Sequence, residues 1–465
     1  MNPGTPKPPP AVGSMLRKGA LPLYVDNGLC VPVIFKYDKH DFRHAGRRNS
    51  GRMKNYIADM IGDLSPGVRR FIATESLFGL GAGMLALILN LHLLALGFNE
   101  EEIGKVTSVG ALAMGFLSLP AGLLVRKAGR KKMLVLGMAL LALGLAGFAF
   151  GTSKLDVMAS QLAWSVGMTA VVTSEIQLIF QYCRDKKEET RAYSLLFAVF
   201  TLFTGAGTLL GGFLPKWLGG SSTVYQYTFL AAAGCLGLAA VLRGLLLPSQ
   251  ATKIPKAENT AVQAHETHGA GAGNKVPLFV LCVIIFLSGA LFGLLNPYLN
   301  VILKGRFGWE DGAISMLLTV SGVFLFFGSL LVPYLLEKLG LRKAFAVLFA
   351  GNALLAFLMG LTVPAAVFSV LLLFRGGLFT MLSNVIDSEA MSAVPENDRN
   401  LFAGLRTIAR SSGNSLASYA AGWMLSTSDY SLPFLVTGCL LVLGYGLYVW
   451  TAQPILEKRR RSRFT

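Results

Sequence analysis

Between two long apolar stretches lies the run Gly122-Leu123-Leu124-Val125-Arg126-Lys127-Ala128-Gly129-Arg130-Lys131-Lys132. A related run, Pro333-Tyr334-Leu335-Leu336-Glu337-Lys338-Leu339-Gly340-Leu341-Arg342-Lys343, follows 211 residues later. Aligned without a gap, residues 97–132 and 308–343 share ten identities, among them Gly129 with Gly340. A basic loop that is repeated in register, each time after one apolar helix, predicts a chain built from two similar halves.

The composition is that of a membrane protein. The chain has 465 residues, of which 53% are hydrophobic and 14% charged, and its mean hydropathy is +0.56. A soluble domain usually carries about 25% charged residues. The net charge of +17 could suggest nucleic-acid binding. Because the positive charges lie in short clusters between apolar runs of about 20 residues, we expect no nucleic-acid partner.

Apolar runs that match a bilayer about 30 Å thick predict an all-α membrane protein with twelve transmembrane helices in two pseudo-symmetric six-helix bundles. In the N-terminal bundle, residues 66–247, the expected spans are 71–97, 104–125, 133–152, 156–182, 192–215 and 225–247. In the C-terminal bundle, residues 277–452, they are 277–303, 313–336, 344–363, 365–390, 400–425 and 432–452. We expect a cytoplasmic linker at 248–276 and a basic cytoplasmic tail at 453–465.

The segment before the first span, residues 1–65, is expected to be a weakly ordered cytoplasmic tail. A start at Met53 is an open alternative for residues 1–52. Ser65-Pro66 predicts a side-chain N-cap and a first turn for the first span.

The distribution of Lys and Arg predicts the orientation. With the N-terminus in the cytoplasm, 34 of the 42 Lys and Arg residues fall on the cytoplasmic side, with Arg243 counted in the linker cluster. Five fall outside and three fall within spans. By the positive-inside rule, this asymmetry places both termini in the cytoplasm, and we expect the protein in the cell membrane.

The sequence indicates no metal, no cofactor and no enzymatic activity. Four of the five cysteines lie in or beside apolar runs, which is typical of packing thiols. His265-Glu266-Thr267-His268 lacks the spacing of a helical zinc site. Neither a phosphate-binding Gly-rich loop nor a Gly-x-Ser-x-Gly turn is present, so we expect no catalytic residue.

Twelve spans in two halves, with a Gly-x-x-x-acid-basic-x-Gly-basic-basic loop after spans two and eight, resemble the major facilitator superfamily of secondary transporters. The resemblance covers about residues 66–452. It implies that Gly122 and Gly129 are packing and turn glycines. It also implies that Lys127, Arg130 and Lys131 are basic members of a loop that latches the cytoplasmic side of the bundle.

The first loop departs from the family pattern, because Arg126 stands at the acidic position. The second loop keeps the acid as Glu337, followed by Lys338, Gly340 and Arg342. The resemblance therefore implies a gating role for both loops but puts the N-terminal latch in doubt. A purely topological role, in which basic residues anchor the cytoplasmic face, is the alternative.

Three arginines, Arg375, Arg406 and Arg410, lie inside predicted spans, where a charge costs roughly 2.5–3.5 kcal/mol. Arg375 is near the expected midplane of span ten, and Arg410 lies on the order of 15 Å inside span eleven. Arg406, Arg410 and Asn414 repeat every four residues along one helix face. We expect Arg375, Arg406, Arg410 and Asn414 to bind the solute. For Arg406, pairing with nearby acids or with membrane lipid headgroups is the alternative.

Glu175 is the predicted proton-coupling residue. It lies roughly two turns before the cytoplasmic end of span four, whereas Glu75 is expected near the inner interface. A carboxyl group in a low-dielectric site can bind and release a proton as the site faces alternate sides of the membrane. A static ion pair between Glu175 and an arginine is the alternative.

Asn296 and Asn300 of span seven complete the expected pocket. They flank Pro297, which removes a helical hydrogen bond, and irregular backbone is tolerated in transporters where it lines a cavity. A simple packing bend at Pro297 is the alternative.

These features predict a secondary active transporter that moves a small organic solute by alternating access, coupled to protons. Several buried arginines and few buried acids favour an anionic or zwitterionic solute. The short external loops resemble those of bacterial efflux and metabolite permeases, which favours export over uptake. We expect a monomer whose partners are the solute and membrane lipids. A non-transporting receptor or lipid-handling protein that reuses the fold is the second hypothesis.

Overall fold

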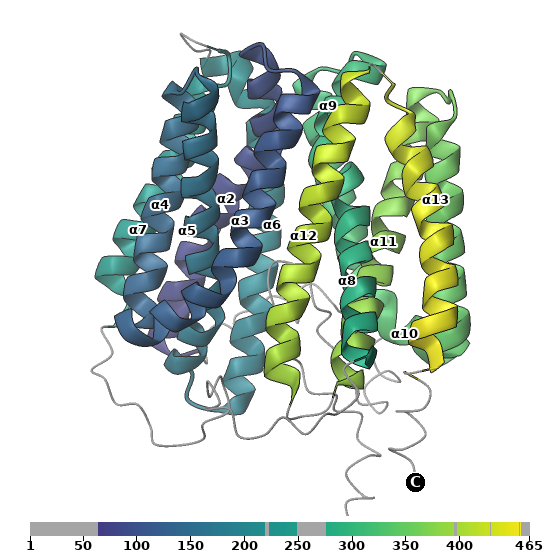
Figure 1. The fold of residues 1–465 in the computed structure, drawn as a ribbon. Coiled ribbons are helices and arrows are strands. Elements are labelled where there is room, and N and C mark those ends of the chain that lie inside the picture. The colour runs from purple at the N-terminus through teal and green to yellow at the C-terminus, as the bar shows by residue number, and fades with distance from the viewer. Residues whose placement is uncertain are drawn as a thin grey trace, which may run out of the picture.

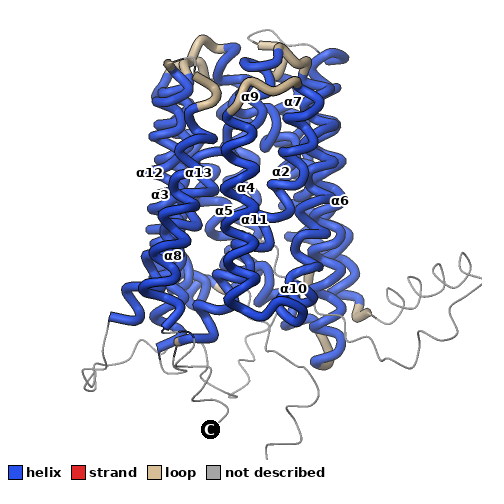
Figure 2. The backbone as a smooth tube through the Cα atoms, turned by 90° about the vertical axis from the view of Figure 1, so that its right-hand side faces the viewer, coloured by secondary structure: helices blue, strands red, loops and turns tan. Residues whose placement is uncertain are grey.

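All regular structure is helical in the part of the chain that the computed structural model describes, residues 64–218, 223–248, 276–394, 398–427, 429–454 and 456. Figure 1 shows the helices of the first half of the chain on one side and those of the second half on the other. Figure 2, a view turned by 90° about the vertical axis, shows that the long helices run roughly parallel between the two opposite ends of the molecule. The expected tails at 1–65 and 453–465 and the expected linker at 248–276 fall largely outside the described residues.

The N-terminal half contains six helices, α2 (Pro66–Ala95), α3 (Glu100–Ala128), α4 (Arg130–Phe150), α5 (Lys154–Tyr182), α6 (Lys186–Leu218) and α7 (Gln226–Leu246). The C-terminal half starts with α8 (Val276–Leu295), a 3-10 turn (Asn296–Tyr298) and α9 (Leu299–Phe307). It continues with α10 (Asp311–Gly360), α11 (Ala365–Ala393), α12 (Arg399–Ser426), α13 (Leu432–Leu447) and a π-helical turn (Tyr448–Ala452). Every predicted span overlaps one or more of these elements, and the 3-10 turn that interrupts span seven contains Pro297, where the break is predicted.

Ten helices of the described residues are long and apolar enough to cross a membrane. Helix α10 counts once among them, although its backbone leaves the helical region at Gly340 (φ 70°, ψ 166°) and divides it into rods 311–339 and 341–360. Helix α12 has 28 residues, but its arginines, serines and Asn414 keep its hydropathy low. With α10 taken as two rods and α12 included, the helices match the twelve predicted spans.

The repeat in the sequence is also present in the backbone. Helices α3 and α10 begin 211 residues apart, which is the interval between the two basic loops. The described residues contain four glycines with positive φ, and these form two pairs at the same interval, Gly97 with Gly308 and Gly129 with Gly340. The two copies therefore share the turns at both ends of a rod as well as their residue types.

The start of α2 corrects one expectation. Ser65 precedes Pro66 at the first helical turn as predicted, but its side chain does not cap the helix. The Ser65 hydroxyl donates to the Tyr182 carbonyl oxygen at 2.7 Å. The Ser65 backbone N–H donates to the Glu188 carboxylate at 2.5 Å. The beginning of α2 is thus fixed by the last residue of α5 and the first turn of α6, which supplies the Glu188 carboxylate to the positive end of the helix dipole.

Glycines allow the helices within each half to approach closely. A Cβ atom on Gly207 of α6 would lie 2.2 Å from the Leu80 carbonyl oxygen of α2. A Cβ on Gly413 of α12 would lie 2.0 Å from the Phe286 carbonyl oxygen of α8. No larger residue fits at these contacts without displacing a backbone, as expected for small-residue interfaces in membrane bundles.

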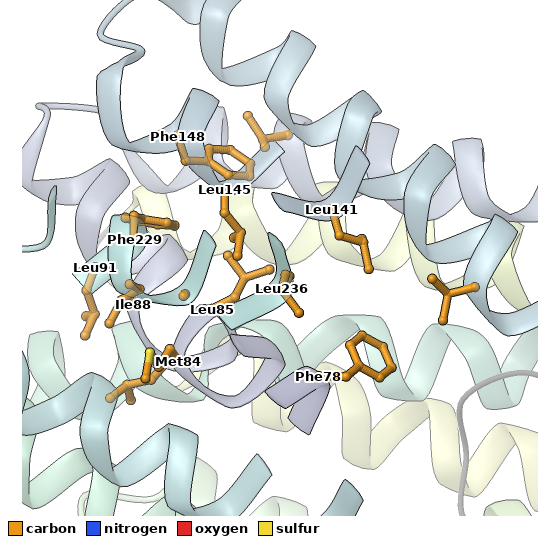
Figure 3. Close-up of a cluster of buried hydrophobic side chains, with 14 of the residues drawn as sticks. Phe78, Met84, Leu85, Ile88, Leu91, Leu141, Leu145, Phe148, Phe229 and Leu236 are labelled. Carbon is orange, nitrogen blue, oxygen red and sulfur yellow. The ribbon is translucent and has the colours of Figure 1, made fainter. Parts of the chain in front are cut away.

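An apolar core fills the N-terminal half between α2, α4 and α7. Figure 3 shows side chains that come together from these helices. They include Phe78 and Ile88 of α2, Leu145 of α4, and Phe229 and Leu236 of α7. Because lipid tails are as apolar as these side chains, close packing contributes most of the stabilisation here. This rigid core adjoins the charged residues described next, since Phe78 also contacts a buried arginine.

Candidate functional site

The two ends of the bundle differ. We call one the short-turn end, where the connections α2–α3, α4–α5 and α9–α10 lie. The other is the basic-loop end, where the repeated loops turn at Gly129 and Gly340 and where α2 begins. In Figure 1 the short-turn end is at the top.

Three charged residues form a buried cluster in the N-terminal half, which we call the N-terminal charge cluster. The Arg243 guanidinium of α7 donates through Nη2 to the Glu75 carboxylate of α2 and through Nη1 to Glu175 Oε1 of α5 at 3.2 Å. Its Nε donates to Thr74 Oγ1 at 3.2 Å. The side chains of Arg243 and Glu75 are 0% and 1% exposed, whereas Glu175 is 12% exposed. Two carboxylates therefore share one guanidinium, and only Glu175 is partly accessible.

Aromatic rings enclose the same guanidinium. Arg243 Cζ lies 4.7 Å from the centroid of the Phe71 ring and 5.9 Å from that of Phe78. Both rings belong to α2, so the cation is held on its faces by aromatic quadrupoles and along its edges by acids and a hydroxyl. This arrangement compensates the loss of water around the charge.

A second cluster, the C-terminal charge cluster, joins α11 and α12. Arg410 donates through Nη2 to the Asp387 carboxylate and through Nη1 to Ser383 Oγ at 3.4 Å. Arg406 Nε lies 3.5 Å from the same Asp387 oxygen. Arg406 therefore has the acidic partner that was considered as its alternative to solute binding. Here one carboxylate serves two guanidinium groups, the reverse of the N-terminal cluster.

The acids of the two clusters occupy related places. Glu175 lies seven residues before the end of α5, and Asp387 lies six residues before the end of α11. They are 212 residues apart, close to the interval of the repeat. The two halves thus hold an acid at the same depth but surround it with different numbers of arginines.

Arg375 of α11 differs from the other buried arginines. It is 2% exposed, and no hydrogen bond or ion pair joins it to another described residue. Its Nε and Nη2 atoms are buried without an acceptor. The guanidinium lies over the ring of Phe379, with Cζ 5.7 Å from the ring centroid.

The amides that were expected to line a pocket lie in two places. Asn414 is next to the C-terminal charge cluster in sequence and accepts a hydrogen bond from Ser418 at 3.2 Å. Asn300 is buried and donates to the Leu87 carbonyl oxygen of α2 at 2.6 Å, so it joins the two halves. Asn296 begins the 3-10 turn and is half-buried.

Polar contacts between the halves gather at the short-turn end. The Tyr225 hydroxyl before α7 donates to Asp311 Oδ2 at 2.7 Å, and Lys304 Nζ donates to Tyr225 Oη at 2.9 Å and to Asp311 Oδ1 at 2.8 Å. Lys216 and Glu310 form a further ion pair at 2.5 Å. Burial and the neighbouring Asp311 carboxylate raise the pKa of Tyr225, so its phenol keeps the proton that it donates. We call Tyr225, Lys304 and Asp311 the short-turn lock.

The predicted gating residues surround the turns at the basic-loop end. Gly122, Arg126 and Lys127 lie near the end of α3, and Arg130 and Lys131 begin α4 after the turn at Gly129. Lys131 Nζ donates to the Leu247 carbonyl oxygen at 2.7 Å, which ties the first loop to the end of α7.

In the second loop, Glu337 and Lys338 precede the turn at Gly340, and Arg342 follows it. Lys338 Nζ lies 3.3 Å from Tyr334 Oη within the same helix. The side chains of Glu337, Lys338 and Arg342 are all exposed.

Arg243 was missed as a site residue. It was counted with the linker, but it is a fully buried residue of α7, so that assignment is wrong. Leu245-Leu246-Leu247 continue the apolar run after Arg243, and this continuation was the available signal. Glu75 was expected near the interface, but it is buried because α2 begins nine residues earlier.

Comparison with known proteins agrees with this architecture. The family model described as the Major Facilitator Superfamily matches residues 72–417 and 281–464. Multidrug resistance protein 2 of Bacillus subtilis (strain 168) is 22% identical over 385 residues, which cover 80% of this chain and 92% of that protein. The gallate transporter of Pseudomonas putida is 25% identical over 393 residues, or 76% of this chain and 80% of that protein.

Solved structures show the same fold. A bacterial homologue of the human lysosomal transporter Spinster, in an inward-facing and unoccupied conformation, superposes with a TM-score of 0.70 at 13% identity, covering 84% of this chain and 97% of the other. The nucleoside transporter NupG superposes with a TM-score of 0.67 at 15% identity, covering 83% and 99%. With a family model that matches most of its length and a helical repeat among the described residues, this chain belongs to the major facilitator superfamily.

Proposed function

We propose that this protein is a secondary active transporter that moves a small organic solute by alternating access and couples this movement to protons. The observation that carries the proposal is the uneven junction between the halves. Polar side chains of both halves meet at the short-turn end, whereas both charge clusters lie nearer the basic-loop end. Such an arrangement favours a state that is closed at one end, as alternating access requires.

The N-terminal charge cluster supports proton coupling through Glu175. Two carboxylates and one guanidinium carry one net negative charge when all are ionised, and one proton makes the group neutral. A buried net charge is costly, so gain or loss of that proton changes the stability of this packing. Glu175 is the partly exposed acid of the cluster and is therefore the one that water can reach.

The C-terminal half supports an anionic or zwitterionic solute. Arg375, Arg406 and Arg410 bring three positive charges into one half, where Asp387 is the paired acid. We place Asn414 and Asn296 beside the solute and assign Asn300 to the contact between halves. Of the two relatives described above, one is named for multidrug resistance and one for gallate, so both drug export and carboxylate transport fit this family.

The placement in the cell follows from the basic residues. We propose a monomer in the cell membrane with both termini in the cytoplasm, so that the basic-loop end faces the cytoplasm. In this orientation the loops around Gly129 and Gly340 close the cytoplasmic side during the cycle. Glu337 supplies the acid of the second loop, whereas the first loop has a basic residue, Arg126, at its acidic position.

Transport in proteoliposomes tests this function. Labelled organic anions and drugs are offered with and without an imposed pH gradient. We expect one of them to accumulate only with the gradient, and Glu175→Gln to abolish gradient-driven accumulation. Glu101→Gln, which removes an exposed carboxylate at the short-turn end, is the matched control and should transport normally. Binding without any accumulation would instead indicate a receptor, and movement that ignores both the gradient and Glu175→Gln would refute proton coupling.

A further inference from the structure

Arg375 is an arginine without a protein counterion among the residues that the structure describes. The arginines of the two charge clusters each have an acid: Arg243 has Glu75 and Glu175, and Arg406 and Arg410 have Asp387. A buried guanidinium that lacks an anionic partner destabilises the folded protein. In membrane helices, such an unpaired charge marks a functional group.

The unpaired atoms define the shape of the missing partner. Nε and Nη2 are neighbouring donors on one edge of the guanidinium, and both are buried without an acceptor. Two parallel N–H donors at this spacing match the two oxygens of one carboxylate. The Cζ atom of Arg375 lies over the ring of Phe379, one turn further along α11. The edge formed by Nε and Nη2 has no acceptor and is the part of the guanidinium available to a ligand.

The surroundings favour a single negative charge on an apolar body. Leu372 and Phe379, about one turn before and one turn after Arg375, are also buried on α11, and Phe379 in turn adjoins Phe292 of α8, with ring centroids 6.5 Å apart. One guanidinium neutralises one charge, whereas a phosphate monoester carries about −1.5 to −2. Aromatic rings near the ligand are suited to an apolar or aromatic group.

We propose that the edge of Arg375 formed by Nε and Nη2 binds the carboxylate of an apolar or aromatic monocarboxylate, and that this arginine selects the solute. The proposal rests on the proposed transport function and narrows its solute class. Arg406 and Arg410 then serve to position α11 against α12 through Asp387. A solute reaches Arg375 when the helices around α11 separate, and its carboxylate offsets the cost of the buried charge.

Thermal unfolding of the purified protein with benzoate tests this assignment, with benzamide as the uncharged probe of the same shape. We expect benzoate to raise the melting temperature and benzamide to have no effect. Arg375→Gln should raise the benzoate concentration needed for the same shift by at least about 10-fold. Arg375→Lys keeps the charge but lacks the fork, and should give an intermediate loss. Arg70→Gln removes an exposed arginine of α2 and is the matched control.

The fold of the variant is checked by its melting temperature without benzoate, which should be at or above that of the wild type because the substitution removes an uncompensated buried charge and breaks no ion pair with a described residue. Equal effects of benzoate and benzamide on the wild type, or an unchanged benzoate effect in Arg375→Gln, would overturn the proposal. Arg375-dependent binding of benzoate without accumulation of any solute in vesicles would overturn the transport function alone. Accumulation of a carboxylate that Arg375→Gln leaves unchanged would overturn this inference alone.

Discussion

At the scale of single residues, Arg243 and Arg375 contrast a buried charge that is paired with acids and a buried charge without a described acid. Both guanidinium groups are buried and both contact phenylalanine rings. Arg243 satisfies two carboxylates, so its removal leaves acids without a partner in a low-dielectric interior. Replacement of Arg375 leaves no acid among the described residues without its partner. The same substitution should therefore have opposite effects on stability at the two positions.

We expect Arg243→Met to lower the free energy of unfolding by about 3–5 kcal/mol, because Glu75 and Glu175 lose their cation. Arg375→Met should leave the free energy of unfolding unchanged or increase it. Thermal or denaturant unfolding of both variants in the same detergent measures the difference. A second change, Glu75→Gln in the Arg243→Met background, should restore part of the loss. Equal destabilisation by both substitutions would show that the ion pairs of Arg243 do not contribute to the free energy of unfolding.

Much of the C-terminal cluster could be predicted from sequence, because a charge inside an apolar span is visible without a structure. Arg375, Arg406 and Arg410 stand out in this way, and pairing of Arg406 with a nearby acid is a prediction that Asp387 confirms. The pairing of Arg243 with Glu75 could not be found, since these residues are 168 positions apart. Only the packing of α2 against α7 brings them together.

At the scale of helices and turns, the two basic loops share a backbone conformation that only glycine adopts easily. Gly129 has φ 89° and ψ 143°, and Gly340 has φ 70° and ψ 166°. Nothing lies within 4 Å of a Cβ built on either residue. Conformation, and not space, therefore requires glycine at these turns.

We expect Gly129→Ala and Gly340→Ala each to lower the free energy of unfolding by about 1–3 kcal/mol. Gly308→Asn is the matched control. Gly308 is a left-handed residue with φ 66° and ψ 24°, a conformation that asparagine tolerates. Unfolding curves of the three variants measure the effect. If the alanine variants are as stable as the asparagine control, the turns relax without cost and the conformational argument is wrong.

The repeated turns were predictable, because glycines in register identify them in the sequence. The anchoring of α2 was less so. Ser65 followed by Pro66 is typical of an N-cap, yet the Ser65 hydroxyl bonds to Tyr182 and the carboxylate of Glu188 bonds to the backbone instead. A local signal placed the start of the helix correctly but could not reveal a partner more than 100 residues away.

At the scale of the whole molecule, the short-turn lock holds the two halves together. Lys304 and Asp311 belong to the C-terminal half and Tyr225 to the N-terminal half. The lock is partly buried, so its hydrogen bonds are not fully exchanged for water. Weakening it should favour states in which the short-turn end is open.

We expect Asp311→Ala to increase the population that is open at the short-turn end by about 5-fold, since it removes the acceptor of both Tyr225 and Lys304. The readout is maleimide labelling of Ser315→Cys in a cysteine-free background, because Ser315 is buried against Gly212 across the junction of α10 and α6. Lys105→Gln, which breaks the exposed pair with Glu101 within α3, is the control. A labelling rate that Asp311→Ala leaves at the control value would show that the lock does not hold this end closed.

Helix α3 and the first rod of α10 each contain 29 residues and are bounded by matching glycines. At 1.5 Å per residue, each is about 43 Å long. If the two halves rotate against each other, helices of equal length displace their basic loops by equal distances. Deleting one residue from either helix would shorten it by about 1.5 Å and rotate the loop that follows it by about 100° about the helix axis. Selection on this movement would therefore act on the two helix lengths jointly, and an insertion in one helix would need a matching insertion in the other.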